Sequence, residues 1–152
     1  MKAGDASLRL DNQLCFKLYA ASRLVTRAYQ PMLTQLGLTY PQYLVMLVLW
    51  EWHQQPSEQP TVKALGARLL LDSGTLTPLL KRLQGQGLLE RKRSSADERE
   101  VHLALSEAGW SLYAKALPLK HQLLCDRQVE SQSLEGLRQQ LDGVLAQLLS
   151  SQ

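Results

Sequence analysis

The sequence predicts a mainly α-helical protein that carries one small β-hairpin. Apolar residues recur at helical spacing along most of the chain, and capping residues mark where successive helices begin. Two extended runs, LLERKR at 88–93 and REVHLAL at 99–105, are joined by the polar segment SSADE, which is typical of a hairpin. A chain of 152 residues is most simply one domain, and we expect residues 1–152 to form a single one.

The first predicted helix begins after Asp11, whose carboxylate is expected to accept hydrogen bonds from the N–H groups of the first turn. Pro31 is expected to kink or end this helix near Gln30, because proline cannot continue the helical hydrogen bonding. The helix is amphipathic, and its apolar residues share one broad face: Leu14, Leu18, Ala21, Leu24, Val25 and Ala28.

A second helix is predicted from Pro41 to about Trp52. Thr39 and Gln42 have the spacing of a capping box, and Pro41 falls in the first turn, where its missing N–H costs little. The helix is apolar nearly all round (YLVMLVLW), which indicates a central, buried element. The polar segment HQQPSEQP at 53–60 is predicted to be a loop.

Two shorter helices are predicted to lead into the hairpin. Thr61 is expected to cap the first of them, VKALGARLL. Either Ser73 or Thr75 is expected to cap the second, and a Thr75 cap would place Pro78 within the first turn. Gly85 and Gly87 supply the stop of this helix.

Two further helices are predicted after the hairpin. Ser106 is expected to cap the first, which Pro118 is expected to interrupt. The last helix is predicted between about Ser133 and Leu149. It carries an apolar stripe along one face, formed by Leu134, Leu137, Leu141, Leu145 and Leu148.

The order of a short helix, a helix that begins with small hydroxylated residues and a basic hairpin is what a winged helix-turn-helix needs to hold a helix in a DNA groove. The net charge of +3 is a weak excess, but residues 81–99 carry six basic side chains against three acids. This local excess is either an electrostatic footprint for DNA or simply a solvated face. The DNA-reading part is expected at about 41–105, and the helices at about 8–38 and 106–150 are expected to form a homodimer on a pseudo-palindromic site.

Seven side chains are candidates for contacts with double-stranded DNA. The hydroxyls at the start of the reading helix are placed to reach phosphates or base edges, and two basic residues follow one to two turns later. Arg99, at the hairpin tip, is long enough to enter a minor groove, and Asp97 is expected to orient its guanidinium. Each candidate has a plainer interpretation as a cap, a solvated charge or a hairpin ion pair. The candidates are Ser73, Thr75, Thr77, Lys81, Arg82, Asp97 and Arg99.

Several motifs together resemble the MarR family of winged-helix regulators: DSGTLTPLLKRL, the DER of the hairpin, and LGLTYPQYLVMLVLWE. The N-terminal LDNQLCFKLYAASR, which contains Cys15, is similar to the OhrR-type sensors of organic hydroperoxides. The resemblance covers about residues 8–116, and the loop HQQPSEQP looks longer than is usual in the family. It implies an intertwined homodimer that represses a peroxide-resistance gene until a cysteine is oxidised.

The chemistry of Cys15 also follows from its place in the chain. With Asp11 as the cap, Cys15 lies at the end of the first turn, where the helix dipole favours a thiolate and the Asp11 carboxylate opposes it. Tyr19 lies one turn on, whereas Tyr29 is about 21 Å further along the axis and needs an antiparallel partner helix to approach Cys15. The resemblance implies that Tyr29 and Tyr40, with Tyr19 nearby, donate hydrogen bonds that stabilise the thiolate. The alternatives are that Cys15 is a small buried apolar residue and that the tyrosines are packing residues.

The second cysteine, Cys125, lies in the predicted helix after the hairpin. A second thiol can trap the sulfenic acid that a hydroperoxide forms on the first, and the product is a disulfide. The resemblance implies a two-cysteine sensor with an intersubunit Cys15–Cys125 bond. The alternative is that Cys125 is incidental, since disulfide geometry cannot be judged from spacing alone.

Other chemistries find little support in the sequence. The first residues contain no apolar segment typical of a signal peptide, no apolar run approaches the roughly 18 residues of a membrane span, and two cysteines suggest a cytosolic protein. His53, His102 and His121 lack metal-ligand spacing with the cysteines, and no cofactor motif is present. We therefore expect a regulator rather than an enzyme, with DNA, a second copy of the chain and organic hydroperoxides as partners. The alternatives are a MarR-type regulator induced by a small phenolic ligand and a thiol peroxidase.

Overall fold

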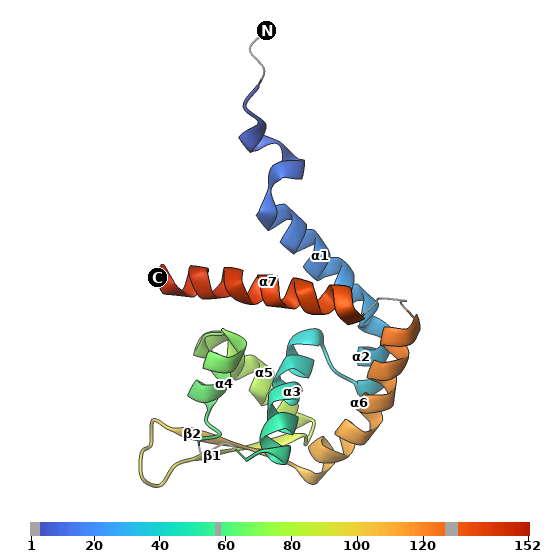
Figure 1. The fold of residues 1–152 in the computed structure, drawn as a ribbon. Helices are drawn as coiled ribbons and strands as arrows, with labels where there is room; N and C mark the ends of the chain where they lie inside the picture. Colours follow the sequence, from blue (N-terminus) through green and yellow to red (C-terminus); the bar gives the residue numbers. More distant parts are fainter. Residues whose placement is uncertain (1–3, 57–58, 127–130) are drawn as a thin grey trace. The chain divides into compact units, whose positions relative to one another are not determined.

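The computed structural model describes residues 4–56, 59–126 and 131–152, and for residues 125, 126 and 131–133 it describes the backbone only. The chain divides into two compact units, Met1–Ala116 and Leu117–Gln152. Figure 1 shows the elements in chain order: η1 (Ala6–Leu8), η2 (Leu10–Asn12), α1 (Leu14–Ala28), α2 (Gln30–Leu36), α3 (Tyr40–Gln54), α4 (Val62–Leu69), α5 (Ser73–Gly85), β1 (Leu89–Arg93), β2 (Val101–Leu105), α6 (Glu107–Asp126) and α7 (Ser131–Ser150). The predicted fold class, mainly helical with one hairpin, is confirmed.

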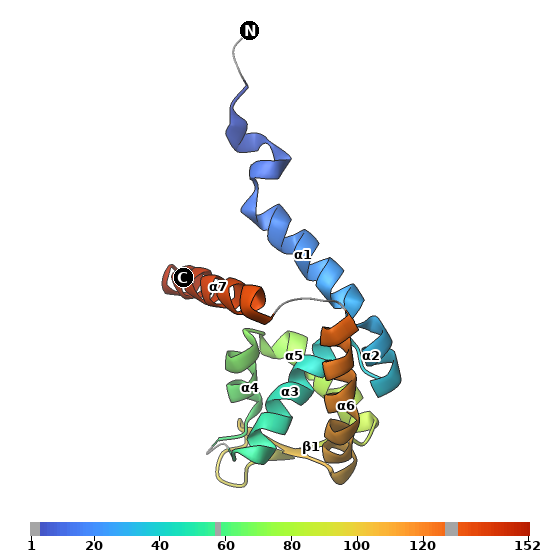
Figure 2. The same ribbon diagram turned by 45° about the vertical axis from the view of Figure 1, so that its right-hand side comes forward.

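Helix α3 is the central element of the first unit. Its capping box is present as predicted: the Thr39 hydroxyl accepts from the Gln42 N–H at 3.3 Å, and the Gln42 side chain accepts from the Thr39 N–H at 3.0 Å. In both views α3 lies between α4 on one side and the start of α6 on the other (Figures 1 and 2). Its buried apolar residues, which form much of the core, are Tyr43, Val45, Met46, Val48, Leu49 and Trp50.

The turn between α4 and α5 brings the two helices into close contact. Thr61 caps α4 as predicted, since its hydroxyl accepts from the Ala64 N–H at 3.1 Å. Leu70 adopts the left-handed conformation (φ 56°) that ends α4. Gly66 allows the turn to approach, because a Cβ there would lie 2.8 Å from the Leu71 carbonyl oxygen. This is the helix-turn-helix that the sequence predicted.

The cap of α5 differs from the prediction. Asp72, rather than Ser73 or Thr75, is the N-cap, and its Oδ1 accepts from the Thr75 N–H at 2.7 Å. Hydrogen bonds from Thr75 hold the pKa of the Asp72 carboxyl below its usual value. A carboxylate accepts more strongly than a hydroxyl and also interacts favourably with the helix dipole. Pro78 consequently lies in the second turn of α5 and not in the first.

The hairpin follows α5 after a tight reversal. Gly87 has φ 74° and its N–H donates to the Gln84 carbonyl, so the glycine stop is confirmed. Strands β1 and β2 are antiparallel, with Leu89 opposite Leu105 and Arg93 opposite Val101. Ser106 then caps α6 as predicted, because its hydroxyl accepts from the Gly109 N–H at 3.0 Å.

The start of α1 was predicted wrongly. Asp11 lies in the 3-10 turn η2 and its carboxylate is 3.9 Å from the Lys17 Nζ, whereas the N-cap of α1 is Gln13 without a side-chain cap bond. The Gln13 side-chain amide instead donates hydrogen bonds to the Ser7 and Arg9 carbonyls, which close a local loop before the helix. The predicted end is confirmed, since α1 stops at Ala28 and α2 begins at Gln30.

Helix α6 runs without a break from Glu107 to Asp126, so the predicted interruption at Pro118 is wrong. Proline removes one helical hydrogen bond, here to the carbonyl of Ala114. Both Ala114 and Pro118 are exposed, so water can solvate that carbonyl and the helix continues. The last helix, α7, matches its prediction within two residues at each end.

Among the described residues no single helix is long and apolar enough to cross a membrane; only the bent pair Leu14–Leu36 and Tyr40–Gln54 reaches that length and composition.

Candidate nucleic-acid interface and cysteine site

A groove of about 890 Å³ runs between α4, the start of α5 and the hairpin, which we call the wing groove. It brings together four of the predicted DNA contacts, Ser73, Thr77, Asp97 and Arg99. Residues 41–105 thus place the hydroxyls of one helix and the tip of the hairpin around a shared hollow. The other three predicted contacts, Thr75, Lys81 and Arg82, are exposed on α5 but do not line the groove.

Helix α5 presents its polar face from a rigid base. Its opposite face is fixed in the core by Leu76, Leu80 and Leu83, each at most 1 % exposed. On the polar face the Thr77 hydroxyl donates to the Ser73 carbonyl at 2.7 Å. Because these leucines anchor the helix, its polar face can contact DNA without a change in the packing of the core.

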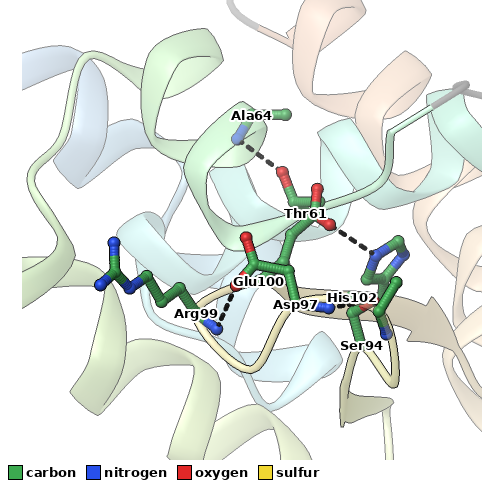
Figure 3. A network of polar contacts seen from close by, with 8 residues as sticks. Thr61, Ala64, Ser94, Asp97, Arg99, Glu100 and His102 are labelled. Atoms are coloured by element: carbon green, nitrogen blue, oxygen red, sulfur yellow. Dashed lines mark hydrogen bonds and ion pairs between the residues drawn. The ribbon is translucent and has the colours of Figure 1, made fainter.

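The tip of the hairpin is built by short-range hydrogen bonds (Figure 3). The Ser94 hydroxyl accepts from the Ala96 and Asp97 N–H groups at 3.2 and 3.4 Å, and the Asp97 Oδ1 accepts from the Arg99 N–H at 3.0 Å. The Arg99 guanidinium points away from Asp97 in this view. Asp97 therefore shapes the backbone of the tip, and its role in orienting the Arg99 guanidinium stays a prediction.

The hairpin is tied to the start of α4. The Leu103 N–H donates to the Pro60 carbonyl at 2.7 Å, and Thr61 and His102 form an antiparallel bridge. On the same strand edge the Glu100 carboxylate lies 3.6 Å from the His102 Nε2 (Figure 3). These contacts fix the spacing between the two walls of the wing groove.

Two basic residues of the wing groove, Lys63 and Arg91, were not among the predicted DNA contacts. Lys63 is an exposed residue near the start of α4, and Arg91 lies on β1, where its Nε donates to the Gln84 side chain at 2.7 Å. The first helix of a helix-turn-helix crosses the DNA backbone, and this rule, which was not applied to α4, is the signal that would have identified Lys63. Arg91 belongs to the basic stretch at 81–99, but only the folded hairpin shows that it faces the groove.

Cys15 is the second residue of α1 and is exposed. With Gln13 as the N-cap, Cys15 lies at the start of the first turn and not at its end, as the expected Asp11 cap would have placed it. No acidic residue lies in this first turn. Tyr19, one turn on, is 65 % exposed, and the Arg23 guanidinium carbon lies 4.7 Å from the centre of its ring. Because α1 is one uninterrupted helix, Tyr29 is about 21 Å from Cys15 of the same chain.

The structure brings Tyr29 and Tyr40 together with a third tyrosine, Tyr43. The ring centroids are 5.6 Å apart for Tyr29 and Tyr40, 6.0 Å for Tyr29 and Tyr43, and 6.2 Å for Tyr40 and Tyr43. Burial raises the pKa of Tyr40, and burial together with Tyr29 raises the pKa of Tyr43 to about 12. Both phenols therefore remain hydrogen-bond donors near neutral pH. Tyr43 was not among the predicted site residues, and the signal that would have identified it is its spacing of three residues from Tyr40, which places both on one helix face.

The side chain of Cys125 lies outside the described residues, although its backbone belongs to the last turn of α6. Its pairing with Cys15 thus stays a prediction.

Within the described part of the chain, no group of three or more histidine, cysteine or acidic side chains is placed to hold a metal ion.

The helix-turn-helix, the hairpin and the groove between them define a winged helix-turn-helix protein. Residues 27–115 match the family model described as transcriptional regulator SarA/Rot. The chain belongs to this family, whose winged-helix fold is of the MarR type, and the MarR-like resemblance is confirmed.

Two relatives are closely similar over nearly the whole chain. The organic hydroperoxide resistance transcriptional regulator of Bacillus subtilis is 50 % identical over 132 residues, which cover 87 % of this chain and 84 % of the relative. The solved structure of reduced AbfR bound to DNA has a TM-score of 0.79 and 36 % identity, and covers 95 % of this chain and 98 % of AbfR. A solved structure of disulfide-formed AbfR has a TM-score of 0.62 at 36 % identity, with 91 % and 94 % coverage. A further solved structure, that of AbfR of Staphylococcus epidermidis, has a TM-score of 0.75 at 34 % identity, with 95 % and 96 % coverage.

Proposed function

We propose that the protein is a homodimeric, redox-sensing repressor that binds a pseudo-palindromic operator and releases it when an organic hydroperoxide oxidises Cys15. The observation that carries this proposal is the exposed Cys15 in the first turn of α1 of a chain that is half identical to a hydroperoxide-resistance regulator. The solved states of AbfR, reduced on DNA and disulfide-formed, support a cysteine switch of this kind. Such a regulator acts in the cytoplasm, where thiols are kept reduced.

The dimer is supported by the uncovered face of α1. No residue of α1 is buried in the single chain, and four of its large apolar side chains are 37–63 % exposed: Leu14, Leu18, Leu24 and Val25. Apolar surface of this kind is stabilised when a second copy covers it. An antiparallel pairing of two α1 helices would also bring Tyr29 and Tyr40 of one chain to Cys15 of the other, which the length of α1 forbids within one chain.

The proposed chemistry starts with the Cys15 thiolate. The sulfur attacks the terminal oxygen of R–O–O–H, the O–O bond breaks, and the products are Cys15 sulfenic acid and an alkoxide that takes a proton to become R–OH. The Tyr29 and Tyr40 hydroxyls donate to the thiolate and stabilise it. The Cys125 thiol of the other subunit then condenses with the sulfenic acid, so that a disulfide forms and water leaves.

The proposed DNA interface is the wing groove together with the exposed face of α5. Ser73, Thr75 and Thr77 face phosphates or base edges, Lys81 and Arg82 extend this surface, and Arg99 enters the minor groove. The helices at 8–38 and 106–150 join the two copies. A Cys15–Cys125 bond within this dimerisation part changes the spacing of the two reading helices. These helices must lie about one DNA turn apart to bind the two half-sites, so the change weakens operator binding.

An operator-binding assay with and without cumene hydroperoxide tests the proposal. We expect the parent to release DNA on stoichiometric oxidation, Cys15→Ser to stay bound, and Cys125→Ser to yield no crosslinked dimer on a non-reducing gel. Normal release by Cys15→Ser would contradict the cysteine switch and favour a regulator that binds a small ligand. A parent band that stays monomeric on the gel would exclude the intersubunit disulfide alone, and repeated turnover with a reductant would indicate a peroxidase.

A further inference from the structure

Tyr43 is the innermost ring of the tyrosine cluster. It is 4 % exposed, whereas Tyr29 and Tyr40 are only half-buried. Its ring contacts both of them and also contacts Trp50, with ring centroids 6.3 Å apart at 68°. Tyr43 thus lies between two partly exposed phenols and the protein core.

The ring behind Tyr43 is firmly anchored. Trp50 is 3 % exposed, and its indole Nε1 donates to the Gly109 carbonyl at 2.9 Å in a buried hydrogen bond. Tyr113 packs against Trp50 on α6, with centroids 5.7 Å apart. A side chain packed against such a ring has little freedom to change rotamer.

We propose that Tyr43 is a positioning residue, whose ring holds Tyr29 and Tyr40 in the orientation in which their hydroxyls meet the sensing thiolate. This inference rests on the proposed function, because it concerns the same thiolate. Donors must be held within a few tenths of an ångström of a productive geometry by packed neighbours, and Tyr43 is the neighbour that Tyr29 and Tyr40 share. The raised pKa of Tyr43, about 12, keeps its phenol uncharged beside them, so it adds no competing anion.

The test measures the alkylation of Cys15 by iodoacetamide as a function of pH, in a Cys125→Ser background so that only one thiol reacts. Tyr43→Leu removes the ring but keeps an apolar side chain, and Tyr43→Phe keeps the ring. We expect Tyr43→Leu to slow alkylation at neutral pH about tenfold, as the loss of one hydrogen bond to a charged group would. Tyr43→Phe should react as the parent does. Trp52→Leu is the matched control and should react as the parent does, because it removes a ring of the same helix that lies beside Pro60 and Leu103.

The outcomes separate the inference from the proposed function. Equal slowing by Tyr43→Leu and Tyr43→Phe would overturn positioning by the ring, because the hydroxyl would then be the active group. Unchanged alkylation in Tyr43→Leu, with slowed alkylation in Tyr29→Phe and Tyr40→Phe, would overturn the inference and leave the proposed function intact. Unchanged alkylation in all of these variants, with normal DNA release by Cys15→Ser, would overturn the proposed function itself. Operator binding without hydroperoxide verifies that each variant folds, and Tyr43→Met replaces Tyr43→Leu if that variant does not.

Discussion

Replacing the basic residues of the wing groove with uncharged ones should make operator binding less sensitive to salt. Lys63, Arg91 and Arg99 line this groove from its two walls, α4 and the hairpin. If one strand of the DNA backbone follows the groove, each of these cations neutralises a phosphate and releases condensed counterions. Each phosphate contact contributes about 0.9 to the slope of log K against log salt for B-DNA.

A dimer carries the groove twice, so a single substitution removes two contacts per operator. Lys63→Gln or Arg91→Gln should therefore reduce the slope by about 1.8. Between 50 and 200 mM salt, a fourfold range, the parent should lose about 12-fold more affinity than either variant. Arg99→Ala should weaken binding as well while the dimer stays intact, because the wing tip is remote from α1 in the chain and is built by its own local hydrogen bonds.

Fluorescence anisotropy of a labelled operator duplex at several salt concentrations measures this slope. Lys115→Gln is the matched control, because Lys115 carries the same charge but binds the Gln35 carbonyl at 2.6 Å and does not line the groove. Slopes of Lys63→Gln and Arg91→Gln that equal the parent slope would refute the path of the DNA strand through the groove. A slope reduced as strongly by Lys115→Gln would show that overall charge, and not the groove, governs the salt effect.

Two further predictions concern the elements that build the interface. Asp72→Ala removes the cap of α5 and should lower the urea midpoint of unfolding at neutral pH. Because the folded-state pKa of Asp72 lies below 3.8, the difference from the parent should vanish as the pH falls through that lowered value. A difference that stays constant down to pH 2 would count against the cap. Gly109→Ala should destabilise the protein by about 1–3 kcal/mol or more in urea unfolding, because its Cβ would collide with the Leu88 carbonyl oxygen and lie 2.8 Å from the Leu105 side chain. Gly136→Ala, on α7 with nothing within 4 Å, is the control and should be neutral or stabilising.

The elements whose signals are local were the ones predicted well from the sequence. The Thr39, Thr61 and Ser106 caps, the glycine stop at Gly87 and the hairpin were all predicted correctly, because each depends on residues within a few positions of one another. Where several local signals competed, the prediction went wrong. Asp72, Ser73 and Thr75 can each cap α5, and Asp72 does so in the structure because its carboxylate accepts the Thr75 N–H more strongly than a hydroxyl would.

Cys15 and the hydroxyl face of α5 were determined by the sequence alone, because a reactive residue type and a helical period can be read directly from it. The tertiary structure decided which residues lie beside them. Lys63 and Arg91 are 28 residues apart in number yet line one groove, and Tyr43 of α3 contacts Tyr29, which lies between α1 and α2. Such contacts depend on how buried faces pack, and the packing of faces that are distant in the chain leaves no periodic trace in the sequence.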